Sequence, residues 1–152
     1  MMTSYQIRPV SKDDLEEVLE LCALHAAYEK ADYDPGGKKE NLSRLIFSDQ
    51  PSLYILVVQQ GTRLIGYASL TKQCSTWDAN HYIYMDCLYM REEARSQGIG
   101  AVLMDRIKEF SKDQGCHLIQ WQTPDFNVRA VKFYKRIGGR ALQKERFFLD
   151  AV

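Results

Sequence analysis

The chain has 152 residues, which is enough for one domain that buries a hydrophobic core without disulfides or a metal. Lys plus Arg and Asp plus Glu each total 20, so the formal net charge is zero, whereas a nucleic-acid or membrane partner would favour a basic excess. No apolar run approaches the ~20 residues of a membrane span, and Met1 to Tyr5 lack the basic start and apolar stretch of a signal peptide. We therefore expect a cytoplasmic protein with no nucleic-acid or membrane partner, in which any anion site is local.

The cysteines indicate reduced thiols rather than a metal site. They form no C-x-x-C pair, and no histidine stands at metal-ligand spacing from them. Scattered cysteines in a chain without a secretion signal are usually reduced and packed. We expect no bound metal, and free thiols at Cys22, Cys74, Cys87 and Cys116.

The first third of the chain predicts a strand followed by two helices. Residues 5–10 alternate between polar and apolar, as a short strand does. Ser11 and Asp14 form a capping-box pattern that opens a helix reaching about Tyr28. Residues 34–37 (DPGG) break the chain, and a short helix is predicted over 39–46.

The middle of the chain predicts a hairpin and then a buried strand. Residues 52–59 and 63–70 are rich in β-branched and aromatic side chains and are joined by a turn at Gly61. Residues 82–90 (YIYMDCLYM) are almost continuously apolar, the pattern of a strand that is covered on both faces.

The last third predicts helices over 98–110 and 128–137, a strand over 117–122 between them and a final strand over 146–149. The second of these helices ends at Gly138, a residue typical of helix C-termini. The order of elements predicts an α/β fold: a single domain, residues 1–152, with one mixed central sheet and helices on both faces.

A glycine-containing loop, Arg95-Ser96-Gln97-Gly98-Ile99-Gly100, lies between the 82–90 strand and the next helix. A helix N-terminus offers unpaired N–H groups and about half a positive charge to a phosphate, and an arginine adds a forked donor. Ala101 follows the loop where a Walker motif has Lys-Ser/Thr, and Leu103 stands where a dinucleotide loop has its third glycine. The glycine spacing alone leaves open both a phosphate site and a turn that binds nothing.

Two motifs resemble the GNAT superfamily of N-acetyltransferases. Arg-x-x-Gly-x-Gly after an apolar strand is similar to the coenzyme A pyrophosphate loop of that family, and residues 127–138 (NVRAVKFYKRIG) resemble its Asn-x-x-Ala-x-x-Phe-Tyr-x-x-x-Gly segment. The opening Ile7-Arg8-Pro9 is similar to its first strand. Residues 75–77 (STW) and 133–136 (FYKR) look most like the diamine (spermidine/spermine) acetyltransferases, a branch in which homodimers are usual.

This resemblance implies that acetyl-CoA is the co-substrate. Its pantetheine arm would pair with the end of the 82–90 strand like an added strand, and a backbone N–H there would hold the oxyanion. Asn127 would also bond the coenzyme, although Asn is equally suited to cap the following helix. The implied coenzyme contacts are Leu88, Tyr89, Met90, Arg95, Ser96, Gln97, Gly98, Ile99, Gly100, Ala101, Asn127, Tyr134 and Arg136.

Asp86 is the candidate base. An amine with a pKa near ~10 is mostly protonated at pH 7, so a base, often acting through water, assists its attack. Asp86 is the one charged residue in YIYMDCLYM, where burial is costly without a partner or a function. By resemblance it falls where many family members carry a base; a hydrogen-bonded structural carboxylate is the alternative.

Tyr134 is the candidate acid, because the family uses the tyrosine of this position to protonate the departing thiolate. A packed aromatic side chain is the alternative. Cys87 is conceivable as a nucleophile, but strand alternation places it on the face opposite Asp86, and we expect a small buried side chain instead.

The candidate acceptor residues are Tyr28, Glu29 and Asp32. They belong to residues 25–34 (HAAYEKADYD), which contain three acids and two tyrosines, and in the relatives this region borders the acceptor groove. Acids with aromatics suit a cationic amine, while a solvated charged face is the alternative.

These residues together predict an acetyl-CoA-dependent N-acetyltransferase. It would transfer the acetyl group to a primary amine of a small molecule, with a polyamine or diamino compound favoured, by direct attack in a ternary complex. A protein lysine or N-terminal acetyltransferase and a non-catalytic acyl-CoA sensor remain alternatives. A pure sensor would not need Asp86 and Tyr134 together.

Overall fold

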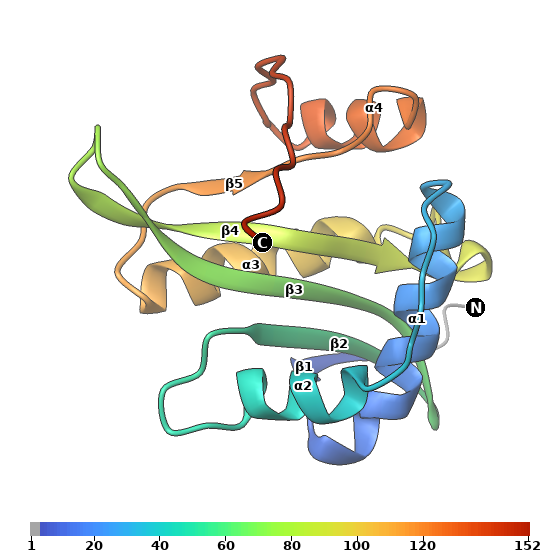
Figure 1. Cartoon of the computed structure of the whole chain (residues 1–152). Helices are drawn as coiled ribbons and strands as arrows, with labels where there is room; N and C mark the ends of the chain where they lie inside the picture. Colours follow the sequence, from blue (N-terminus) through green and yellow to red (C-terminus); the bar gives the residue numbers. More distant parts are fainter. Residues whose placement is uncertain (1–3) are drawn as a thin grey trace. The chain divides into compact units, whose positions relative to one another are not determined.

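The computed structural model describes residues 4–152 (Figure 1). The expectation that the N-terminus carries no signal peptide falls in part on residues 1–3, outside the described residues. The chain divides into two compact units, one reaching Gln122 and the other running from Thr123 to Val152. The first unit holds the whole sheet, and the second holds the last helix.

The sheet has five strands in the spatial order β1-β2-β3-β4-β5. The first four pair antiparallel, and β5 pairs parallel to β4, so the sheet is mixed as predicted. The strands are β1 (Gln6–Pro9), β2 (Tyr54–Gln60), β3 (Arg63–Ser75), β4 (Asn80–Met90) and β5 (Ile119–Trp121).

The helices are α1 (Leu15–Tyr28), α2 (Lys38–Ile46), α3 (Ile99–Asp113) and, in the second unit, α4 (Val128–Arg136). Single 3-10 turns precede α1, over Lys12–Asp14, and the α3 loop, over Glu92–Ala94. In Figure 1, α1 and α2 lie on one side of the sheet of the first unit and α3 lies on the other. Helices therefore cover both faces of the sheet, as the sequence predicts. No helix in the part of the chain that the structure describes is long and apolar enough to cross a membrane.

Alternating side chains build one core on each face of the sheet. Val57 and Tyr67 pack against Leu15, Val18 and Leu21 of α1, and all five are nearly inaccessible to solvent. This periodicity of two on the strands and three to four on the helix is the one that the sequence shows.

On the opposite face, the ring of Tyr54 in β2 lies 5.1 Å from the ring of Phe110 in α3, measured between centroids. Leu56 and Val58 share the phase of Tyr54 and are buried, and α3 contributes Leu103. The phase of each strand thus decides which helix its side chains meet, and this assignment matters at the candidate site.

The strand predicted over Arg146–Leu149 is wrong: residues 139–152 form neither helix nor strand. The Arg146 guanidinium instead lies 4.8 Å from the centroid of the Phe148 ring. A short apolar run becomes a strand only through hydrogen bonds to a neighbouring strand, and side-chain pattern alone does not supply that neighbour. The β3–β4 hairpin is longer than predicted, because its paired strands continue to Ser75 and Asn80.

The predicted capping box is present at the start of α1. The Asp14 carboxylate accepts hydrogen bonds from the backbone N–H and the hydroxyl of Ser11, at 2.7 and 3.0 Å, and pairs with the Arg8 guanidinium of β1 at 2.7 and 2.9 Å. The Arg8 hydrogen bond is the main reason that the pKa of Asp14 is lowered from 3.8 to about 2. One carboxylate therefore joins the first strand to the first helix.

We predict that Asp14→Asn lowers the free energy of unfolding by about 2 kcal/mol at pH 7. The hydrogen bonds from Arg8 and Ser11 lower the pKa of Asp14 in the folded state, and a pKa lowered in this way stabilises that state. The sign follows from the depressed folded-state pKa: the stabilisation is complete above the ordinary pKa near 3.8 and is lost as the pH falls through about 2. Urea unfolding of both proteins between pH 7 and pH 2 measures the difference, with Asp13→Asn, an exposed neighbour, as the control. A difference that stays constant over this range would refute the role given to the ionised Asp14.

Candidate active site

The predicted phosphate loop ends at the N-terminus of α3 in a form suited to an anion. Ser96 and Gly98 adopt left-handed backbone conformations, with φ of 64° and 79°, which turn the chain into the helix at Ile99. A Cβ at Gly98 would meet nothing within 4 Å, so the space next to it is open. The first turn of α3 contains no acidic residue. The N–H groups in the first turn of this 15-residue helix can therefore donate hydrogen bonds to a phosphate without competition from a carboxylate of that turn.

Arg95 is fixed between the end of β4 and the end of α1. Its Nε donates to the Met90 carbonyl at 3.0 Å. Its guanidinium carbon lies 4.6 Å from the centroid of the Tyr28 ring and 5.3 Å from that of Tyr89. A guanidinium has five N–H donors, so this arrangement leaves donors for an anion bound at the loop.

β4 changes its neighbour along its length. β5 pairs with it only from Ile83 to Met85, while β3 remains paired as far as Met90. From Asp86 onward, no strand among residues 4–152 pairs with the β5-side edge of β4. The segment Leu88–Met90 therefore presents backbone groups that an extended ligand can bind as an added strand does.

β4 contains a β-bulge at Asp86. Ser69 of β3 lies opposite Cys87 and Leu70 lies opposite Met85, so Asp86 is the extra residue between the two pairs. An extra residue reverses the phase of side-chain alternation. The Met85 side chain lies on the face of the sheet that α3 covers, whereas the Cys87 side chain packs against the core between the sheet and α1.

The bulge overturns two expectations about Asp86. Its side chain is exposed rather than buried. It also lies on the same side as Cys87, since the Cys87 thiol donates to the Asp86 carboxylate with Sγ 3.7 Å from Oδ2. Alternation with a period of two holds only in a regular strand, and the bulge interrupts it at this residue.

Burial keeps the thiols near Asp86 protonated. Desolvation raises the pKa of Cys87 to about 11, and the negative charge of Asp86 acts in the same direction. Burial likewise raises the pKa of Cys22 and places that of Tyr67, whose hydroxyl interacts with both thiols, far above its ordinary value. The two thiols and the phenol beneath α1 are therefore neutral at pH 7.

The structure adds His25 to the candidate residues, which the sequence did not single out. Its Nδ1 lies 3.1 Å from the Tyr67 hydroxyl, and its Nε2 pairs with the Glu29 carboxylate one helical turn later. Its ring stacks on Tyr89 with centroids 5.3 Å apart and planes inclined by 25°. The signal in the sequence was the helical spacing of residues 18, 21 and 25, which places His25 on the core face of α1.

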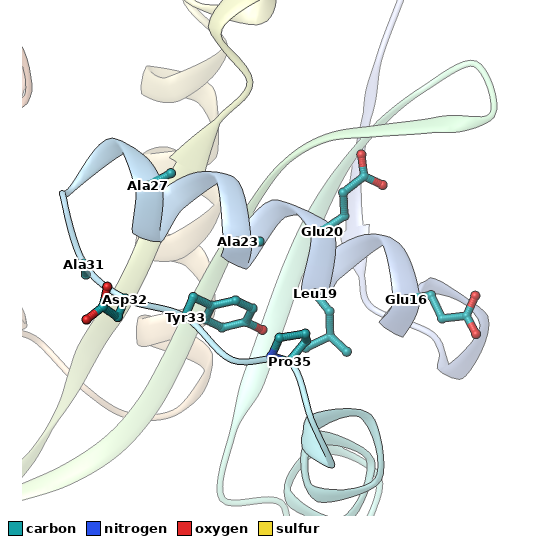
Figure 2. Close-up of a pocket in the computed structure, with 9 residues that line it drawn as sticks. All are labelled: Glu16, Leu19, Glu20, Ala23, Ala27, Ala31, Asp32, Tyr33 and Pro35. Carbon is teal, nitrogen blue, oxygen red and sulfur yellow. The ribbon is translucent and has the colours of Figure 1, made fainter.

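The three candidate acceptor residues do not share one location. Tyr28 packs edge-on against Tyr89 with centroids 6.5 Å apart, and Glu29 pairs with His25. Asp32 instead lines a cavity of about 560 Å³ along another side of α1 (Figure 2). The cavity is lined by Glu16, Leu19, Glu20, Ala23, Ala27, Ala31, Asp32, Tyr33 and Pro35.

The remaining candidates belong to the second unit. Asn127 caps α4, because its side chain accepts from the Ala130 N–H at 3.4 Å, which confirms the capping role considered from the sequence. The ring centroids of Tyr134 and Phe133 lie 5.4 Å apart, and the Arg136 guanidinium lies 5.6 Å from the centroid of Phe133. Over the residues that the structure covers, 4–152, no three His, Cys, Asp or Glu side chains are grouped to hold a metal ion.

Known proteins resemble both the sequence and the fold. The Acetyltransferase (GNAT) family model matches residues 13–139. A thialysine N-epsilon-acetyltransferase of Sus scrofa is 30% identical over 149 residues, which cover 93% of this chain and 87% of that protein. A spermidine/spermine N(1)-acetyltransferase-like protein of Homo sapiens is 23% identical over 151 residues, which cover 95% of this chain and 22% of that protein.

Solved structures resemble the fold as well. An aminoglycoside N-acetyltransferase solved in complex with CoA superposes with a TM-score of 0.83 at 14% identity, covering 100% of this chain and 98% of that one. The family match spans most of the chain and includes the loop at Arg95 and the Asn127–Gly138 segment. The chain belongs to the GNAT acetyltransferase family and is an N-acetyltransferase.

Proposed function

We propose that this N-acetyltransferase transfers the acetyl group of acetyl-CoA to a primary amine of a small diamino compound or polyamine, and that its two units act together as one domain over residues 1–152. The observation that carries the proposal is the open edge of β4 after Met85, which ends beside the phosphate loop at Arg95. The relatives support the acceptor class, because one is named for an ε-amino group and another for spermidine and spermine.

The open edge of β4 and the loop beside it determine where we place the coenzyme. The pyrophosphate lies on the N–H groups from Gly98 to Ala101 and on the remaining donors of Arg95, with Ser96 and Gln97 in the same loop. Asn127, Tyr134 and Arg136 are the further coenzyme contacts that the family resemblance implies. The pantetheine arm pairs with Leu88–Met90 as an added strand. A backbone N–H of this segment then holds the oxygen of the thioester as it becomes an oxyanion.

The amine attacks the thioester carbon directly in a ternary complex. The C–N bond forms and the C–S bond breaks, while the amine proton passes to Asp86, directly or through water, and the thiolate receives a proton from Tyr134. The exposed position of Asp86 at the bulge supports this role, because a proton that it accepts can pass on to bulk water. Tyr28, Glu29 and Asp32 supply the aromatic and negative groups that a cationic acceptor prefers.

We predict that the protein releases free thiol from acetyl-CoA with ornithine, thialysine and spermidine, and much more slowly with monoamino acids and with a lysine-containing peptide. A thiol-reactive dye measures release across this panel, and mass spectrometry identifies the acetylated product. Release with the peptide alone would favour a protein acetyltransferase. Tight binding of acetyl-CoA without release to any amine would favour a sensor and would contradict the proposal.

We predict that Arg95→Gln and Tyr134→Phe affect different quantities. Arg95→Gln should weaken coenzyme binding by about ten- to a hundred-fold, since it removes charge-assisted bonds to the pyrophosphate. Tyr134→Phe should lower kcat by about 10²-fold or more with little change in coenzyme affinity, since it removes only the acid.

Calorimetry with CoA and steady-state kinetics separate the two effects. Arg63→Gln is a matched control, because Arg63 is a half-exposed arginine that pairs with Glu93 near the same loop. Unchanged CoA affinity in Arg95→Gln would refute the pyrophosphate assignment. If Tyr134→Phe lowered CoA affinity and kcat to the same extent, Tyr134 would be a binding or packing residue rather than the acid.

We predict that Cys87→Ser keeps most of the wild-type turnover. A thiol with a pKa of about 11 is ionised to only about one part in a thousand at pH 8, so it is a poor nucleophile. Incubation with acetyl-CoA alone, followed by mass spectrometry of the protein, should show no acetylated Cys87. An acetylated Cys87 that transfers its acetyl group to added amine would replace direct attack by a two-step mechanism.

A further inference from the structure

His25 uses both of its ring nitrogens. The Glu29 carboxylate can only accept a hydrogen bond, so Nε2 donates to it. In the neutral ring Nδ1 is then the acceptor, and the Tyr67 hydroxyl at 3.1 Å donates to it. The side chain of His25 is 13% exposed, so both contacts form in a largely dry environment, where a hydrogen bond is stronger than in water.

Aromatic rings hold the plane of the imidazole. It stacks on Tyr89 of β4 and meets the Tyr67 ring of β3 at an interplanar angle of 72°, with centroids 6.1 Å apart. Tyr67 is buried in the core, so the hydroxyl that fixes Nδ1 cannot move without disturbing the sheet. The direction of Nε2, and with it the position that a bonded carboxylate takes, is therefore set by the sheet rather than by α1 alone.

Glu29 needs such a support. It caps the C-terminus of α1, where its own N–H bonds the carbonyls of His25 and Ala27. The C-terminal end of a helix carries partial negative charge, which disfavours a carboxylate there. The Glu29 side chain is 31% exposed and pairs with His25 in spite of this unfavourable position. A carboxylate held in an unfavourable place by a buried histidine indicates a function for its position.

We propose that His25 is a positioning residue that fixes the Glu29 carboxylate to bind the second, non-reacting ammonium group of a diamino acceptor. The inference rests on the proposed function and specifies how its acceptor preference arises. His25 does not contact the reacting atoms; Glu29 carries the charge, and His25 with Tyr67 sets where that charge lies. The pair thereby distinguishes diamino from monoamino acceptors, since only the former present a second cation.

Two conservative variants separate the two hydrogen bonds of His25. Asn places a polar group near the position of Nδ1 and loses the contact to Glu29, whereas Gln places one near Nε2 and can keep it. We expect His25→Asn to raise the KM for a diamino acceptor by about ten-fold or more, as loss of a bond to a charged group does. We expect His25→Gln to restore most of that loss, and both variants to leave the KM for a monoamino acceptor near the wild-type value.

Glu29→Gln should raise the KM for the diamino acceptor to a similar extent, and the double variant His25→Asn/Glu29→Gln should be no worse than Glu29→Gln, because both changes remove one interaction. Glu109→Gln, in an exposed carboxylate of α3, is the matched control. Thermal unfolding of each variant shows whether the fold is retained.

An unchanged KM in His25→Asn, or additive losses in the double variant, would overturn the role of His25 while leaving the proposed function intact. Equal loss of kcat with both acceptors in the Asn and Gln variants would also overturn it, since a general structural defect does not distinguish acceptors. A wild-type protein that releases thiol with no amine would overturn the proposed function and this inference together.

Discussion

The one-residue bulge in β4 determines what lies on each side of the candidate active site. Before it, Ile83 and Met85 pair with residues of β3 that face α3; after it, Cys87 and Tyr89 face α1. The same odd-numbered positions thus point to opposite faces along one strand, because an inserted residue reverses the alternation. Asp86, the inserted residue, is released from both cores and is exposed at the point where β5 stops pairing with β4.

The reversed phase is what allows α1 to meet the end of β4. With Tyr89 on the α1 face, His25 stacks on it and Tyr28 packs against its edge, and Arg95 then covers both tyrosines. Gly66 of β3 supports this end of the strand, since a Cβ there would lie 2.9 Å from the Tyr89 carbonyl and 2.3 Å from the sulfur of Met90. In a regular strand Tyr89 would face α3, and α1 would have no aromatic surface on which to pack.

The sequence predicted the order and type of nearly every element, because periodicity and capping residues are local. It also located the loop at Arg95 and the helix cap at Asn127. It failed where the outcome depends on a partner far along the chain. The run YIYMDCLYM looked like a strand buried on both faces because the bulge shifts its apolar phase midway, and only the register with β3 reveals the shift. His25 went unnoticed for the same reason, since its meaning depends on Tyr67, which lies 42 residues further along.

One turn of α1 serves both substrates of the proposed reaction. The Tyr28 ring lies against the Arg95 guanidinium, and Glu29, the next residue, pairs with His25; in the proposed reaction the first contact serves the coenzyme and the second the acceptor. A shift of this turn would therefore disturb a cation–π contact and a carboxylate position at once, each worth on the order of 1 kcal/mol. The sheet limits such a shift, because Tyr67 and Tyr89 hold the His25 ring from two neighbouring strands. The register between β3 and β4, which sets the positions of Tyr67 and Tyr89, therefore also sets the position of the His25 ring at the last turn of α1.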